Sequence, residues 1–178
     1  MNRRKAILQT AGLLGGSLVA SPLLLNGCAG ETATGAITPM DIPFWDEVAE
    51  TILPVTSDSG GAKAAGIGAF MQVIVKDCYD DEEAERFHSG MRSIEERAES
   101  EYGAGFMTLT PEERFELIDA IDREAKATED HAFTMIKDLT LWGYFSSEVG
   151  CQEALRYNPI PGRYEGCIPY HNEPAWAG

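Results

Sequence analysis

The sequence predicts an all-α protein: an irregular bundle of about five helices followed by an extended, proline- and aromatic-rich C-terminal tail. Two observations predict this class. Apolar residues recur at spacings of three and four along most of the chain, which is the period of an α-helix that packs one face against a core. No run of strict apolar and polar alternation is long enough to indicate a strand, so we expect no sheet.

The first predicted helix begins at Thr38 and ends before Pro54. Thr38 offers a capping hydroxyl, Pro39 suits the first helical position, and Asp41 supplies an acid three residues after the cap. Pro54 cannot continue a helix. The apolar stripe is expected to consist of Phe44, Trp45, Val48, Ile52 and Leu53.

Two further helices follow a loop at 57–61. The second is predicted at about 66–79 because apolar residues recur at helical spacing, and its expected stripe contains Ile67, Phe70, Val73 and Ile74. The third has the clearest periodicity in the chain, and acids at 80–83 lie near its N-terminus, where the helix dipole favours them. Its stripe is Phe87, Met91, Ile94, Ala98 and Tyr102.

Gly103 and Gly105 interrupt the pattern, and Thr110-Pro111-Glu112-Glu113 restarts it with a second proline-led capping box. The fourth helix is expected to bury Phe115, Ile118, Ile121 and Ala125. The fifth, at about 130–145, is more apolar and is expected to be buried on most sides. Its apolar residues include Phe133, Ile136, Leu139, Leu141 and Trp142.

The C-terminal segment changes character after Ser146. Residues 148–155 suit a short helix, whereas the prolines of 157–164 exclude its continuation. The tail is too aromatic for a solvated end, so it and the end of the fifth helix are a candidate surface for docking another subunit. For the aromatic residues of the fifth helix, packing in the core is the alternative. The candidate docking residues are Trp142, Tyr144, Phe145, Tyr157, Pro159, Pro161, Tyr164, Pro169, Tyr170 and Trp176.

Residues 1–27 have the pattern of an export signal and are set aside from the fold. The paired Arg3 and Arg4, followed by a weakly apolar stretch, favour a twin-arginine signal, which exports cargo already folded. The residues before Cys28 resemble a lipobox, so Cys28 is a candidate for lipidation and for tethering to the inner or outer membrane; an ordinary cysteine near a cleavage site is the alternative. Residues 28–37 suit a flexible tether and 38–178 a single helical domain. We therefore expect a periplasmic, membrane-tethered protein.

Charge and cysteine content limit the partners. The formal net charge of −15 disfavours nucleic acid and anionic lipid headgroups. If Cys28 is lipidated, then Cys78, Cys151 and Cys167 leave one thiol over after any single bridge, which favours a free thiol or an intersubunit bond. If Cys28 is not lipidated, four cysteines allow three pairings.

No motif in the sequence predicts catalytic, cofactor-binding or metal-binding residues. Gly66-Ile67-Gly68 lacks the rest of a dinucleotide fingerprint and suits the start of a helix. The acids at 80–83 lack the alternating ligands of a calcium loop. The histidines, His88, His131 and His171, have no metal-ligand spacing.

Several segments together resemble the gluconate 2-dehydrogenase subunit 3 family: TILP at 51–54, GIGAF at 66–70, LTLWGYFSSEVG at 139–150 and PGRYEGCIP at 161–169, beside the twin-arginine signal. The resemblance implies a large FAD-containing partner of the glucose-methanol-choline (GMC) type and, as a third subunit, a c-type cytochrome with haem c. It implies oxidation of a sugar, sugar acid or glycoside, as in gluconate 2-dehydrogenases or glycoside 3-dehydrogenases, with no cofactor in this chain. The small subunit would support export and maturation of the flavoprotein. Two alternatives remain, a free-standing exported lipoprotein that binds a ligand or another protein, and a self-sufficient enzyme.

Overall fold

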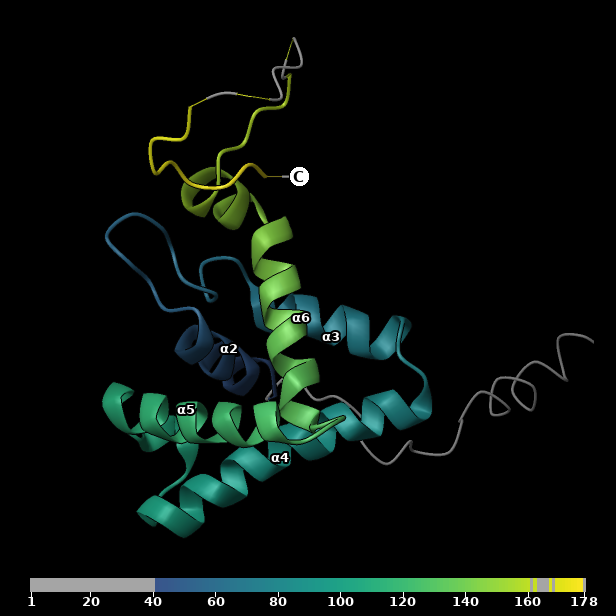
Figure 1. Ribbon diagram of the computed structural model, residues 1–178. Helices are drawn as coiled ribbons and strands as arrows, with labels where there is room; N and C mark the ends of the chain where they lie inside the picture. Colours follow the sequence, from purple (N-terminus) through teal and green to yellow (C-terminus); the bar gives the residue numbers. More distant parts are fainter. Residues whose placement is uncertain (1–40, 161, 163–166, 168, 178) are drawn as a thin grey trace, which may run out of the picture. The chain divides into compact units, whose positions relative to one another are not determined.

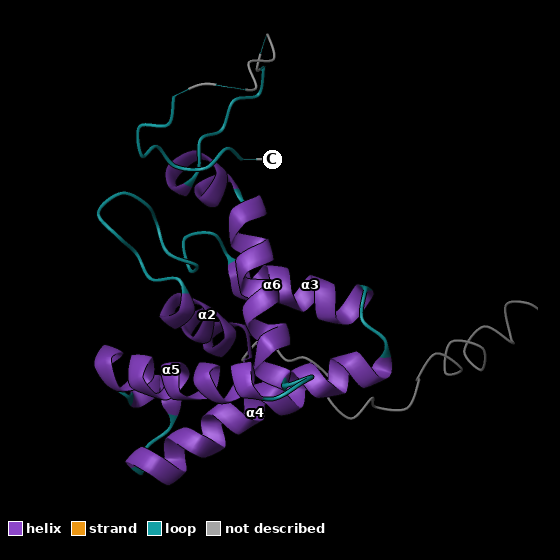
Figure 2. Cartoon of the chain, viewed as in Figure 1, coloured by secondary structure: helices purple, strands orange, loops and turns teal. Residues whose placement is uncertain are grey.

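The computed structural model describes residues 41–160, 162, 167 and 169–177. Within these ranges the chain is helical and contains no strand, which confirms the all-α prediction (Figures 1 and 2). The predicted signal, tether and start of the first helix at 38–40 lie outside the described residues. The elements are α2 (Asp41–Ile52), α3 (Ile67–Asp77), α4 (Asp81–Tyr102), η2 (Phe106–Thr108), α5 (Pro111–Ala127), α6 (Ala132–Ser146) and η3 (Gly150–Ala154).

Local side-chain chemistry starts the helices where the sequence predicts. The Thr110 hydroxyl accepts a hydrogen bond from the N–H of Glu113, and the Glu113 carboxylate accepts one from the N–H of Thr110, so both halves of the capping box form. Asp80 and Glu83 cap α4 in the same way, which confirms the acids at 80–83 as a helix start. Gly66 precedes α3 with a φ of 67°, a left-handed conformation that favours glycine.

Helix α6 forms the centre of the core because it packs against α2, α3, α4 and α5 (Figure 1). Its buried residues face all four neighbours, and the buried Thr140 hydroxyl donates to the carbonyl oxygen of Ile136 at 2.8 Å, so this polar group keeps a partner. The buried residues of α6 are Phe133, Ile136, Leu139, Thr140, Gly143 and Tyr144.

Three apolar residues of the predicted helices lie on the surface. Val73 is 54% exposed, because α3 buries Ile67, Met71 and Val75 instead. Phe115 is 61% exposed, because α5 turns Leu117 and Ile118 to the core. Trp142, a candidate docking residue, is 58% exposed and its ring meets that of Phe70, so α6 is not buried on this side. Helical periodicity predicts that an apolar stripe exists, but the contacts with neighbouring helices decide its edges.

His88 on α4 is expected to make stability depend on pH. Its ring lies 5.8 Å, between centroids, from the rings of Trp45 and Phe87. Burial lowers the pKa of His88 from its ordinary value of 6.5, because the charged ring loses solvation. Below pH 6.5 the unfolded chain therefore binds more protons than the folded one, and the unfolding free energy contributed by His88 falls as the pH falls.

We expect His88→Gln, which cannot be protonated, to lose this part of the pH dependence. The measurement is urea unfolding of both proteins at about pH 7.5 and about pH 5.5. Equal changes in unfolding free energy for the two proteins between these pH values would show that His88 is not responsible.

Candidate docking surface

The end of α6 is fixed to the loop between α2 and α3. The Tyr144 hydroxyl donates to the carbonyl oxygen of Gly60 at 2.6 Å, and the N–H of Gly60 donates to the Glu153 carboxylate on η3 at 2.7 Å. Tyr144 is only 3% exposed. It therefore anchors the base of the tail and does not belong to the exposed aromatic surface, because its hydroxyl and ring are both used inside the fold.

Trp142 and Phe145 lie on the surface at the same end of α6. The Trp142 ring meets the ring of Phe70 edge to face, with centroids 5.3 Å apart, and Phe145 meets Tyr144 in the same way at 5.2 Å. Each ring packs against an aromatic neighbour while much of it faces solvent. Aromatic side chains held in this way suit protein contacts, because little conformational entropy is lost when they bind.

The tail does not simply extend from the bundle, because it turns back to Arg156. The N–H of Arg156 donates to the carbonyl oxygen of Ala175 at 2.8 Å, and the N–H of Ala177 donates to the carbonyl oxygen of Arg156 at 3.0 Å. The Arg156 guanidinium lies 4.0 Å from the centroid of the Trp176 ring and 3.7 Å from the Glu173 carboxylate. These contacts join the two ends of the tail and hold Trp176 over Arg156.

The joined tail presents apolar groups to solvent. Tyr157, Tyr170 and Trp176 are each more than half exposed, and Ile160, which is not among the predicted docking residues, is 81% exposed. Pro159 and Pro169 are exposed as well. Pro161 and Tyr164 lie outside the described residues. The described part of the tail thus exposes five of the ten predicted docking residues.

Arg156 was missed as a member of this surface. Its sequence neighbours carry no motif, and its partners lie near the C-terminus, so only the backbone pairing reveals its position. Proline and aromatic content predicted an irregular segment, but no local signal predicts where such a segment returns.

The cysteines and histidines that the structure describes are not grouped into a metal site. Within the described residues, Cys78, Cys151 and Cys167 are free thiols; Cys78 and Cys167 are exposed, whereas Cys151 donates to the carbonyl oxygen of Phe145 at 3.3 Å. His131 caps α6 by accepting the N–H of Phe133. In the part of the chain that the structure describes, no three His, Cys, Asp or Glu side chains are grouped to hold a metal ion. Arg3, Arg4 and Cys28 lie outside that part.

We expect Arg156→Ala to release the C-terminal end of the tail. The substitution removes the guanidinium from Trp176 and Glu173 but leaves the backbone pairing without side-chain support. The expected result is faster proteolytic cleavage between 157 and 175 and a red shift of tryptophan fluorescence, with an unfolding free energy within about 1 kcal/mol of wild type. Arg92→Ala, which removes an exposed ion pair on α4, is the control, and equal cleavage of both variants would argue against the role of Arg156.

The fold and this surface define a small helical protein with exposed aromatic residues in a C-terminal tail whose two ends pair at Arg156. This arrangement is suited to contact with another protein. The family model of gluconate 2-dehydrogenase subunit 3 matches residues 39–162. The chain therefore belongs to the gluconate 2-dehydrogenase subunit 3 family, as the sequence resemblance predicted, and its family name describes a subunit of a multi-subunit dehydrogenase. No curated protein and no solved structure gave a significant match. Among the described helices, none combines the length and apolarity needed to cross a membrane.

Proposed function

We propose that this chain is the non-catalytic small subunit of a periplasmic, FAD-dependent dehydrogenase of the GMC type. Its substrate would be a sugar, sugar acid or glycoside, with FAD in the large subunit and haem c in a cytochrome subunit. Membership of the subunit 3 family supports a subunit role. The single observation that carries the docking part is the aromatic tail, whose ends are joined at Arg156 and whose rings face solvent.

The docking surface would consist of the tail together with Trp142 and Phe145. These residues are exposed yet held by Phe70, Tyr144 and Arg156, so binding would cost little ordering. Aromatic residues of this kind dominate the affinity of many interfaces. The net charge of −15 favours a partner surface with basic groups.

The test is co-purification of the tagged chain with the co-expressed flavoprotein. We expect recovery of a large subunit whose absorption spectrum shows FAD. Recovery of the chain alone, without colour, would contradict the proposal and favour a free-standing lipoprotein, whereas bound flavin or haem in the isolated chain would favour an enzyme.

Export of the flavoprotein is proposed to depend on the signal of this chain. We expect Arg3→Lys combined with Arg4→Lys to keep both proteins in the cytoplasm, because the twin arginines select the folded-protein route. Cell fractionation measures this, and normal export of the flavoprotein from the variant strain would contradict it.

In the same cells, Cys28→Ala is expected to abolish fatty-acid labelling; retained label would exclude Cys28 as the anchor.

A further inference from the structure

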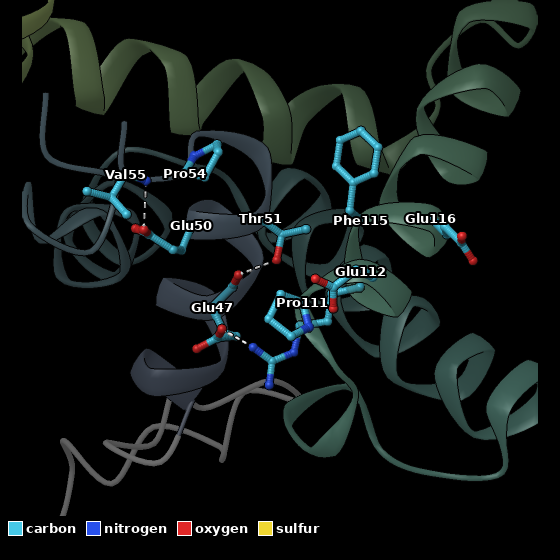
Figure 3. Close-up of a pocket in the computed structure, with 10 residues that line it drawn as sticks. Glu47, Glu50, Thr51, Pro54, Val55, Pro111, Glu112, Phe115 and Glu116 are labelled. Atoms are coloured by element: carbon cyan, nitrogen blue, oxygen red, sulfur yellow. Dashed lines mark hydrogen bonds and ion pairs between the residues drawn. The ribbon is translucent and has the colours of Figure 1, made fainter. Parts of the chain in front are cut away.

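A cleft of about 700 Å³ lies between the C-terminal end of α2 and the N-terminal end of α5 (Figure 3). Pro54, Val55, Pro111 and Phe115 supply its apolar lining. Val55 and Phe115 are both more than 60% exposed, and Figure 3 shows Phe115 standing up from α5. Phe115 continues an apolar stripe yet has no cover in the described fold, so the cleft offers unburied apolar area for which the bundle itself gives no reason.

The polar groups on the α2 side of the cleft already have partners. Glu47 pairs with both Lys63 and Arg114. The Glu50 carboxylate accepts the N–H of Val55 at 3.1 Å and the N–H of Lys63 at 2.8 Å. Glu47 and Glu50 therefore link α2 to the loop that follows it and to α5, and these links fix the walls of the cleft.

Arg114, the basic side chain in the lining, is occupied as well. Its Nε donates to the carbonyl oxygen of Phe106 at 3.0 Å, and its Nη2 donates to that of Met107 at 2.7 Å, while Nη1 pairs with Glu47. A guanidinium with all these contacts has little capacity left for an anionic ligand.

Glu112 and Glu116 are different, because both are exposed, line the cleft together with Phe115 and are spaced one helical turn apart on α5. No hydrogen bond or ion pair joins either side chain to another described residue. The cleft thus combines the exposed Phe115 ring with two carboxylates that are available to a cation. This combination fits a ligand that has an apolar group next to a positive charge.

We infer that this cleft binds a basic, apolar segment of the dehydrogenase partner. An apolar side chain of that segment packs on Phe115 and Val55, and an adjacent Arg or Lys pairs with Glu112 and Glu116. The inference rests on the proposed function and adds a second contact to the aromatic tail. A second copy of this chain is a poor occupant, since 29 acidic residues face 14 basic ones and the two copies repel.

The test uses the full chain co-expressed with the flavoprotein. In Glu112→Gln combined with Glu116→Gln we expect capture to weaken by roughly tenfold at physiological salt, and to depend less on salt than capture by wild type. Glu96→Gln combined with Glu99→Gln is the matched control, because it removes two exposed charges from α4, outside the cleft. Equal capture by the two double variants would overturn the inference.

A photo-crosslinking amino acid in place of Phe115 then locates the occupant. A cross-linked flavoprotein peptide that contains Arg or Lys beside apolar residues supports the inference. A cross-link to a second copy of this chain, or to an acidic peptide, overturns it. If wild type captures no flavoprotein at all, the proposed function fails, whereas capture by wild type with no effect at the cleft removes only the inference.

Discussion

Replacing Trp142 and Trp176 together by serine is expected to weaken capture of the flavoprotein by roughly a thousandfold while the helical fold stays intact. Each ring is more than half exposed, so little buried area is lost from the folded chain. A well-placed aromatic anchor contributes about 2 kcal/mol to an interface, and each 1.4 kcal/mol is a factor of ten, so two anchors account for an effect of this size.

The measurement is the affinity of the purified variant for the flavoprotein, with circular dichroism as the check on folding. Met107→Ser serves as the control, because Met107 is an exposed apolar residue on η2 and belongs neither to the tail nor to the cleft. A folded double variant that binds as wild type does would remove the aromatic surface from the proposed interface.

The sequence predicted the helices well because their ends depend on local chemistry. The capping box at Thr110 and Glu113 involves residues three apart, so it is visible in the sequence and forms in the structure. The predicted stripe of α4 is buried from Phe87 to Ala98 for a similar reason, since its period is long and regular.

The burial of single aromatic residues was less predictable. Trp142 and Tyr144 are two positions apart in one apolar run, yet Tyr144 is buried and Trp142 exposed. The difference comes from the loop that contains Gly60, which covers the Tyr144 side of α6 and receives its hydroxyl. A contact between residues so far apart in sequence leaves no local pattern.

Only part of the candidate surface could be predicted, because its closure also depends on contacts between residues that are far apart in the sequence. Aromatic and proline content identified the tail, but its closure depends on Arg156 and Ala175. Glu112 was expected only as part of the capping box that begins the fourth helix, and the exposure of the neighbouring Phe115 is visible only in the structure.

Replacing Gly150 by alanine is expected to lower the unfolding free energy by about 3 kcal/mol. A Cβ atom at Gly150 would lie 2.0 Å from the carbonyl oxygen of Tyr144 and 3.2 Å from the Cα of Phe145. These are backbone atoms, and Tyr144 is held by its buried ring and its bond to Gly60. The backbone therefore cannot yield without opening η3, the single π-helical turn that carries the tail.

Urea unfolding measures this effect, and Gly103→Ala is the matched control. Gly103 has a φ of 68° but no atom within 4 Å of the added Cβ, so its substitution costs only the strain of the left-handed conformation, about 1 kcal/mol. Equal losses in the two variants would mean that η3 can repack around a side chain. A larger loss at Gly150, joined to weaker capture of the flavoprotein, would instead show that the segment 139–150 serves the interface by fixing the base of the tail. The backbone shape of this segment would then matter more for docking than any single exposed ring, because Gly150 itself offers a partner no side chain to contact.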